Sequence, residues 1–504
     1  MTKSPPGFII ISEVIFLKQT LTKKKKFGYA FGIFTESLVY NMFYTYYLTF
    51  LNEIVGIKPK YSAIIIFISI AWDAVTDPLI GNYTDRPGVD KRRIMKISII
   101  PLAVTFIVAW TSIGAGFSSQ LAKILLYTFI SMCIWIFYTM YSIPYYAIVP
   151  ELTEDYDERT DIRSLSSLLN AFCVGIGNIL PALVPTVAIL LGKRYQSNSY
   201  AVIAAIIGIM AVALGFICCK SLKGVYQPKK AEDGAVYEKV TVKSTFRAFG
   251  DILRLKPTKW FLLFVFFYLA MSTMIQSNLT YMVIDCIGME YDTGIVFVIL
   301  TLVITMAITV PIVEKVANKK DRRFATILFL SIVCALEVII KIVGLDAEVG
   351  GFKIMAVIPA AVLGIGNGTF WTLFYSMGYD LVELNEFKTG ERRESTITAL
   401  PQLVQKFGSA FGILMAGQLL SAYGYDSSKD VAGNESLFTK VTDLKVINGM
   451  ENISTIIPAA ILAVSIICVI IYPMTRERFN ALKVQLDKKR RGEEYTTEGF
   501  EKLL

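Results

Sequence analysis

Trp72-Asp73-Ala74-Val75-Thr76-Asp77-Pro78 sets two carboxylates into the second long apolar segment of the chain. An ionisable side chain at membrane depth costs roughly 2.5–3.5 kcal/mol on insertion scales. Two such side chains, Asp73 and Asp77, therefore call for a cation, a proton or a charged partner. The stretch has two interpretations: a structural ion pair, or a site that carries charge across the bilayer.

The composition indicates a polytopic membrane protein. Hydrophobic residues make up 54% of the 504 residues, charged residues make up 18%, and the mean hydropathy is +0.54. This balance is too apolar for several soluble domains. The net charge of +9 comes from short basic loops and tails and not from an aromatic-interleaved basic face. We therefore expect a lipid bilayer, and no nucleic acid, as the partner.

Twelve apolar segments have about the twenty residues that a helix needs to cross a hydrocarbon core roughly 30 Å thick. The sequence therefore predicts an all-α protein with twelve transmembrane helices. The segments are centred on residues 27–54, 63–81, 94–116, 124–149, 165–191, 200–218, 261–284, 294–316, 324–343, 352–380, 397–423 and 453–472.

Basic residues predict the orientation in the membrane. If each segment crosses once, the five main basic runs fall on one side, which the positive-inside rule makes cytoplasmic. We therefore expect a multi-pass protein of the cell membrane, plasma or inner, with both termini in the cytoplasm. The runs are residues 23–26, 91–93, 229–230, 319–323 and 488–491.

A long polar segment divides the twelve apolar segments equally, and short motifs recur in both halves. Glu-Leu at residues 151–152, followed by Glu-Arg at 158–159, is echoed at 383–384 and 391–392. Matching positions favour two duplicated six-helix bundles with substrate held between them. The predicted divisions are an N-terminal tail at 1–26, a bundle at 27–219, a cytoplasmic linker at 220–259, a second bundle at 260–475 and a C-terminal tail at 476–504.

Several kinds of chemistry are excluded by the residue types present. The chain has no histidine, and its seven cysteines show no metal-ligand spacing. It also lacks the glycine-rich phosphate loop that an ATP-driven pump requires. We therefore expect no enzyme, no resident metal and no cofactor. Transport driven by an ion gradient is the simplest mechanism.

An ordered set of motifs resembles the glycoside-pentoside-hexuronide:cation symporter family over roughly residues 27–475. The resemblance implies the major facilitator fold, in which two pseudo-symmetric bundles of six helices face each other. The motifs are the 72–78 stretch, Asp85-Arg86, Pro144 to Pro150 with Glu151-Leu152-Thr153 and Glu158-Arg159-Thr160, Phe370-Trp371 leading to Asp380, Lys388-Thr389-Gly390-Glu391-Arg392, and Lys406-Phe407-Gly408-Ser409-Ala410.

The resemblance implies a coupling-ion site at the aspartate pair. On a helix, Asp73 and Asp77 share one face, so both can reach one ion. In the family the matching pair binds Na⁺, Li⁺ or H⁺, with a hydroxyl that matches Thr139 beside it. Lys406 matches a family lysine, and our hypothesis is that its ammonium balances the aspartates until a cation arrives. A purely structural role, in helix packing or as a salt bridge, is the alternative for each residue.

The family's sugar-binding residues are only partly kept. Trp371 matches an aromatic residue that lines the sugar cavity. The family's two sugar-binding aspartates fall on Ser37 and Ser142, its arginine on Ser167 and a second tryptophan on Tyr146. Because the pocket loses its strongest charge-assisted hydrogen bonds, we expect the substrate to be held differently. Glu36 and Arg163 are candidates for the displaced charges.

A second motif predicts contacts that gate the transport cycle. Gly81, Asp85 and Arg86 resemble the facilitator signature whose Asp and Arg pair with neighbouring helix ends in one conformation. The mixed charges of Glu158 and Arg159 are its expected partners. An ordinary solvated loop is the alternative.

These observations predict a secondary symporter that imports a sugar, glycoside or uronide by alternating access and uses a Na⁺ or H⁺ gradient. The alternatives are a transporter of a non-sugar amphiphile or organic anion, and a non-transporting membrane sensor. We expect the protein to work as a monomer, with a small-molecule substrate and a coupling cation as partners. The sequence leaves the choice between Na⁺ and H⁺ open.

Overall fold

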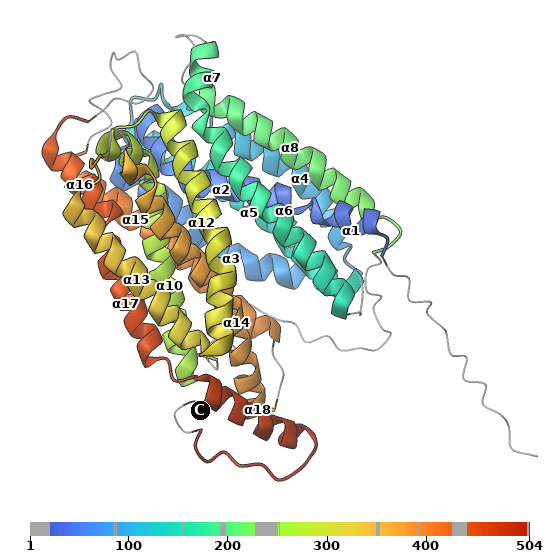
Figure 1. Ribbon diagram of the computed structural model, residues 1–504. Helices are drawn as coiled ribbons and strands as arrows, with labels where there is room; N and C mark the ends of the chain where they lie inside the picture. The colour runs from blue at the N-terminus through green and yellow to red at the C-terminus, as the bar shows by residue number, and fades with distance from the viewer. Residues whose placement is uncertain are drawn as a thin grey trace, which may run out of the picture.

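The computed structural model describes residues 21–84, 86, 88–152, 156–191, 198–226, 250, 252–348, 353–390, 394–425, 441–500 and 503. Every regular element within these residues is a helix. The helices form two groups that lie side by side, the N-terminal group on the right of Figure 1 and the C-terminal group on the left.

The N-terminal group begins with two consecutive helices, α1 and α2, which are separated by a break at Phe31 and Gly32. A break later in the group separates α6 from α7, and these two helices are bent by 43° relative to each other. The elements are α1 (Lys23–Ala30), α2 (Ile33–Thr49), η1 (Phe50–Ile54), α3 (Pro59–Thr84), α4 (Lys91–Ala109), η2 (Ser112–Gly114), α5 (Gln120–Leu152), α6 (Tyr156–Ala182), α7 (Val184–Leu191) and α8 (Ser199–Ser221).

The C-terminal group ends in a polar helix, α18, which packs against α14. The chain terminus lies beside α18 at the bottom of Figure 1. The elements are α10 (Lys256–Ser277), α11 (Leu279–Tyr281), η4 (Met282–Ile287), α12 (Tyr291–Lys319), α13 (Arg322–Val343), η5 (Ile354–Ala356), α14 (Ile358–Thr389), α15 (Glu394–Ala422), α16 (Leu444–Ser454), α17 (Ile456–Ile471) and α18 (Arg476–Arg490).

All twelve predicted segments coincide with helices. Among the described residues, nine helices are long and apolar enough to cross a membrane, or ten with the bent α6–α7 pair. The other two predicted spans are α1–α2, where the α-helix proper of α2 has 17 residues, and α4, which starts with three basic residues. A broken helix makes the first of these spans shorter, and a charged helix end makes the second less apolar.

The two groups repeat the same packing. In the N-terminal group, α3 packs on α5, α4 on α8, and α2 on α6. The helices that occupy the corresponding places in the order of the second group also pack on one another: α12 packs on α14, α13 on α17, and α10 on α15. This correspondence supports the predicted duplication. The domain boundaries stay a prediction, because residues 227–249 of the proposed linker lie outside the described residues.

A further repeat lies at the end of the first long helix of each group. Each helix widens into a π-helix, η1 or η4, that carries an acid, Glu53 or Asp285. A glycine with positive φ follows each one, Gly56 at 72° and Gly288 at 73°. Such a backbone conformation suits glycine because it has no Cβ.

Glycines on α15 bring this helix close to both groups. A Cβ at Gly408 would lie 2.7 Å from the carbonyl oxygen of Phe266 on α10. A Cβ at Gly417 would lie 2.6 Å from the carbonyl oxygen of Pro59 on α3. Small residues of this kind let helix backbones approach within a membrane. As a result, α15 is held against its own group and against the opposite group.

Candidate functional site

The two aspartates of α3 and a threonine of α5 meet in the interior. Asp73 is 1% exposed. The Thr139 hydroxyl lies 2.5 Å from Asp73 Oδ1 and 3.0 Å from Asp77 Oδ1, so it can donate to either carboxylate. The one-turn spacing on α3 gives the two carboxylates one direction, as expected for residues four apart. Three oxygen-bearing side chains therefore face a single point.

Lys406, from α15 of the opposite group, completes this cluster. Its Nζ donates to Asp73 Oδ2 at 2.7 Å and also to Asp77 Oδ2. The lysine side chain is 22% exposed and that of Asp77 is 29% exposed. Because one ammonium serves two carboxylates, the three groups together carry one net negative charge. A buried carboxylate without such a partner would be strongly disfavoured.

The backbone hydrogen bonding of α3, the helix that carries the aspartates, is irregular next to them. Pro78 lies inside α3 and has no N–H to donate to the carbonyl one turn earlier. The Thr76 hydroxyl donates to the Asp73 carbonyl oxygen at 3.0 Å. This part of α3 therefore offers backbone oxygens whose helical hydrogen bonds are altered, in addition to the carboxylates.

Glu36, from α2, forms a second polar cluster with two tyrosines of α5. Its Oε1 accepts hydrogen bonds from Tyr138 and Tyr146, each at 3.1 Å. Its Oε2 is buried and has no hydrogen-bond partner among the described residues. Glu36 also lies within electrostatic range of Lys406 and Asp77. The second cluster is therefore adjacent to the aspartate cluster.

The remaining predicted pocket residues are three side chains of α2, α5 and α14. Ser37 is buried, and its hydroxyl accepts from Asn41 of the same helix at 3.1 Å. Ser142 is also buried. The Trp371 ring on α14 lies edge-on to Phe370, with centroids 5.1 Å apart. A serine hydroxyl carries no charge, so neither serine replaces a lost carboxylate. Glu36 is the acid that lies beside Tyr146, from which it accepts a hydrogen bond. The Arg163 and Ser167 side chains lie outside the described residues.

The predicted gating residues are described only in part. Gly81 lies on α3, and the exposed Arg86 guanidinium lies 5.8 Å from the Tyr83 ring centroid. Asp85 and the side chains of Glu158 and Arg159 fall outside the described residues. The gating contacts therefore stay a prediction.

Sequence reasoning missed a hydrogen-bond network that joins the two groups at the end opposite α18. Glu53 Oε1 accepts from Tyr281 at 2.8 Å and also from Tyr425. The Asn52 amide donates to the Tyr281 hydroxyl at 3.0 Å. An acid at the end of the first apolar segment was the available signal, but its tyrosine partners lie more than two hundred residues away in the sequence.

The helical architecture and the shared ion cluster define a membrane transport protein built from two related helix bundles. The chain belongs to the family described as MFS/sugar transport protein, whose model matches residues 28–476. The predicted family, fold class and sugar-transport class, as opposed to an enzyme, are thereby confirmed.

Relatives in bacteria cover most of the chain. An uncharacterized symporter of Bacillus subtilis, YjmB, is 26% identical over 420 residues, which are 81% of this chain and 85% of that protein. The isoprimeverose transporter of Lactiplantibacillus pentosus is 22% identical and covers 81% of this chain and 82% of its own length. A glucuronide carrier protein homologue of Escherichia coli is 20% identical, with coverages of 94% and 98%.

Solved structures share the fold. The inward-facing, unoccupied form of a bacterial homologue of the lysosomal transporter Spinster matches with a TM-score of 0.64 at 12% identity, over 92% of this chain and 98% of that one. The nucleoside transporter NupG matches with a TM-score of 0.58 at 12% identity, over 91% and 99%. At this identity the likeness establishes the major facilitator fold alone.

Proposed function

We propose that this protein is a cation-coupled symporter that imports a sugar or glycoside. The observation that carries the proposal is the contact of one lysine with two aspartates across the two helix bundles. A small cation, Na⁺ or H⁺, would bind among the oxygens of Asp73, Asp77 and Thr139 and take the place of the Lys406 ammonium. Carboxylate and hydroxyl oxygens are ligands that hard cations prefer.

This exchange gives a physical basis for coupling. Lys406 and the aspartates belong to different bundles, so cation binding removes an ion pair between the bundles. A ligand shifts a conformational equilibrium only through its different affinity for the two states. The cation provides this difference because its ligands come from one bundle while its competitor comes from the other.

The proposed substrate site lies between Glu36 and Trp371. The unpaired oxygen of Glu36 is a strong acceptor for a sugar hydroxyl, and its tyrosine partners Tyr138 and Tyr146 hold the carboxylate in place. The indole of Trp371 offers an apolar face on which a pyranose ring can stack. Ser37 and Ser142 would contribute only neutral hydrogen bonds.

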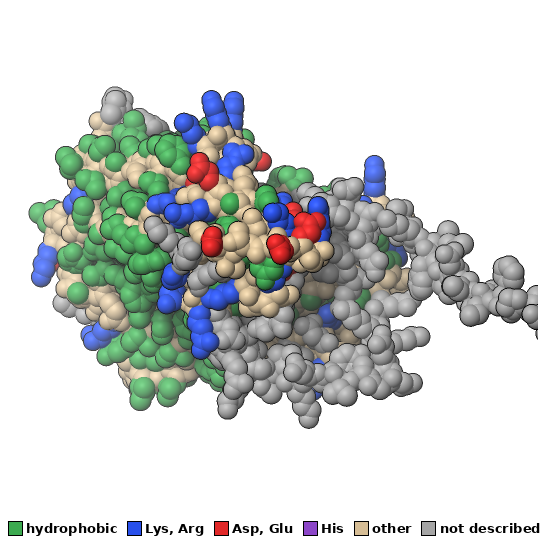
Figure 2. Space-filling view, turned by 90° about the horizontal axis from the view of Figure 1, so that it is seen from below, with side chains coloured by type: hydrophobic (Ala, Val, Ile, Leu, Met, Phe, Trp, Pro, Cys, Tyr) green, Lys and Arg blue, Asp and Glu red, His purple; other side chains and the backbone are tan. Residues whose placement is uncertain are grey.

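The proposal includes an orientation in the cell membrane with both termini in the cytoplasm and a monomer as the working unit. Support for placing each terminal segment on the same side as the expected cytoplasmic loops comes from two contacts. Lys25, near the N-terminus, donates to the Lys223 carbonyl after α8 at 3.3 Å, and Arg476 of α18 donates to the Asn318 carbonyl at the end of α12 at 2.5 Å. The face seen from below in Figure 2 carries scattered basic side chains.

Uptake into proteoliposomes tests the proposal directly. The purified protein is reconstituted, and a panel of neutral glycosides and uronides is offered with an imposed Na⁺ or H⁺ gradient and a membrane potential. One cation per substrate provides about 2.3 kcal/mol at 100 mV, so accumulation of up to about fiftyfold is expected for the correct substrate. Lys406→Ala and Asp77→Asn should each abolish accumulation. No gradient-dependent uptake of any sugar would refute the proposal.

A matched variant separates coupling from general damage. Lys315 is an exposed lysine on α12 of the same bundle as Lys406. Lys315→Ala should accumulate substrate like the original protein. Equal loss in Lys315→Ala and Lys406→Ala would contradict a specific role for the lysine in the ion cluster.

A further inference from the structure

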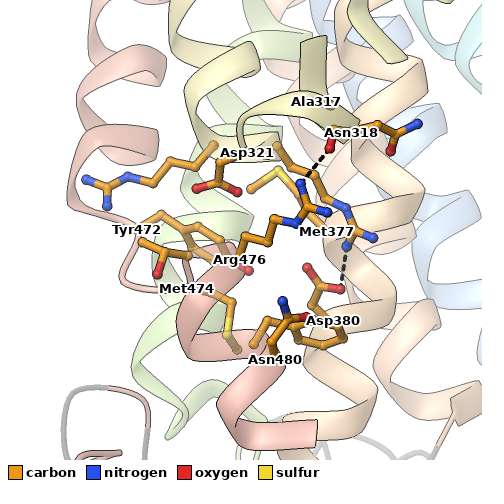
Figure 3. A pocket seen from close by; sticks show the side chains of 13 residues that line it. Ala317, Asn318, Asp321, Met377, Asp380, Tyr472, Met474, Arg476 and Asn480 are labelled. Carbon is orange, nitrogen blue, oxygen red and sulfur yellow. Dashed lines mark hydrogen bonds and ion pairs between the residues drawn. The ribbon is translucent and has the colours of Figure 1, made fainter. Parts of the chain in front are cut away.

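A cavity of about 210 Å³ lies at the α18 end of the C-terminal bundle, away from the ion cluster. It is lined by the end of α12, the start of α13, the second half of α14, the turn between α17 and α18 and the start of α18 (Figure 3). Its charged and polar lining includes Asp321, Arg322, Arg323, Asp380, Tyr472 and Arg476. Neither the ion cluster nor the proposed substrate site includes any of these residues.

The three arginines are fixed in position by part of their donors. Arg322 Nη1 donates to Asp380 at 2.5 Å and to the Ser376 carbonyl at 3.2 Å. Arg323 donates through Nε and Nη2 to the last carbonyls of α17. Arg476 donates through Nη1 to the Asn318 carbonyl. The anchors hold the guanidinium groups at the cavity without using all their N–H groups.

The charge balance of the cavity favours an anion. Three arginines face two acids, and Asp380 is already paired with Arg322. Within the described part of the chain, no hydrogen bond is made by Nε and Nη2 of Arg322, Nη1 of Arg323, or Nε and Nη2 of Arg476. Guanidinium groups bind phosphate oxygens through such pairs of N–H donors.

One helix N-terminus adds to this preference. The helix α13 begins at Arg322, and the side chain of its N-cap residue Asp321 makes no capping hydrogen bond. The start of α18 is different, because its N-cap residue Thr475 accepts from the Arg478 N–H at 3.4 Å. Free N–H groups and the helix dipole favour an anion at an uncapped start such as that of α13.

An independent observation comes from Tyr472. This side chain lines the cavity and is 2% exposed, yet its hydroxyl has no hydrogen-bond partner among the described residues. A buried hydroxyl without a partner costs about 1–3 kcal/mol. Arginines that served only as helix anchors would leave this cost unexplained. A ligand oxygen in the cavity would accept the hydrogen bond from Tyr472.

We propose that this cavity binds a phosphate group, carried by the headgroup of an anionic lipid or by a small soluble phosphate compound. The volume is sufficient for a phosphate with a small attached group, since one water occupies about 30 Å³ in the liquid. Exposed apolar side chains, Phe324 and Ile471, lie next to Arg323 and Tyr472 in the sequence. Exposed apolar side chains on these two helices, α13 and α17, are suited to contact with lipid tails.

The test uses the purified full-length protein in detergent. One arm measures the melting temperature and the heat of binding during titration with inorganic phosphate. The other arm counts bound phosphatidylglycerol by native mass spectrometry. Phosphate alone would assign a soluble ligand, and retention of the lipid would assign a headgroup. No binding in either arm would overturn the proposal.

The variants show whether binding occurs in this cavity. Arg476→Gln and Tyr472→Phe should each weaken the binding seen with the original protein by about tenfold, equivalent to 1.4 kcal/mol. Arg478→Gln is the matched control, because Arg478 lies on the same helix and also donates to a carbonyl, that of Pro473 at 2.6 Å. Unliganded melting temperatures verify that each variant folds. Binding that is equal in all three variants and the original protein would overturn the site.

Discussion

Thr139 joins the two aspartates of the ion cluster through a single hydroxyl group. Its oxygen lies 2.5 Å from one carboxylate and 3.0 Å from the other. Thr139→Val keeps the shape of the side chain and removes this oxygen. We predict that the cation concentration for half-maximal uptake rises by about tenfold, as expected for the loss of one ligand worth about 1.4 kcal/mol. The cation dependence of uptake in proteoliposomes measures the effect.

The control for this residue is a threonine that bonds only to its own helix. Thr309 on α12 donates to the Thr305 carbonyl at 2.8 Å and has no contact with the ion cluster. Thr309→Val should leave the cation dependence unchanged. If Thr139→Val left it unchanged as well, the hydroxyl would not be a ligand.

The element that brings Lys406 to the aspartates is α15, which lies against α10 through glycines. A Cβ at Gly412 would collide with the Ala270 carbonyl and the Thr273 hydroxyl of α10. We predict that Gly412→Val destabilises the bundle by about 1–3 kcal/mol, the usual range for overpacking. The shift of α15 should also remove cation-dependent uptake. Thermal unfolding in detergent and uptake assays measure the two effects.

Gly175 of α6 provides the comparison, since a Cβ there would meet nothing within 4 Å. Gly175→Val also replaces a helical glycine, so it shares the change in helix propensity but not the collision. Equal losses of stability in the two variants would show that close packing of α15 on α10 is unimportant.

At the scale of the whole molecule, the network around Glu53 joins the two bundles at the end opposite α18. The proposed orientation places this end outside the cell. Loss of one hydrogen bond costs about 0.5–1.5 kcal/mol, so Tyr425→Phe should shift the balance toward the outward-open form by about 2- to 10-fold. The KM for external substrate should fall, and the maximal rate should fall with it. Initial uptake rates at several substrate concentrations measure both quantities.

A neighbouring tyrosine is the control for this prediction. Tyr423 accepts a hydrogen bond from Asn452 of its own bundle at 3.4 Å. Tyr423→Phe should therefore leave KM and the maximal rate close to those of the original protein. Unchanged kinetics in Tyr425→Phe would mean that the Glu53 network does not set the balance between the two forms.

The fold class and part of the ion site follow from local features of the sequence. Apolar segments of membrane-spanning length are a local property, and all twelve became helices, including the broken ones at α1–α2 and α6–α7. The spacing of Asp73 and Asp77 likewise places both carboxylates on one helix face whatever surrounds them. The family motifs added Thr139 and Lys406 as candidates, and the structure brings both to the aspartates.

Only the tertiary structure decided which polar groups meet. Lys406 and Asp73 are 333 positions apart, and Glu53 and Tyr281 are 228 apart. Helical periodicity shows which face of a helix is polar, but it contains no information about which other helix supplies the partner. The hydrogen bonds of Tyr138 and Tyr146 to Glu36, and the cavity lined by Arg322, Arg323 and Arg476, could therefore be found only from the packed helices.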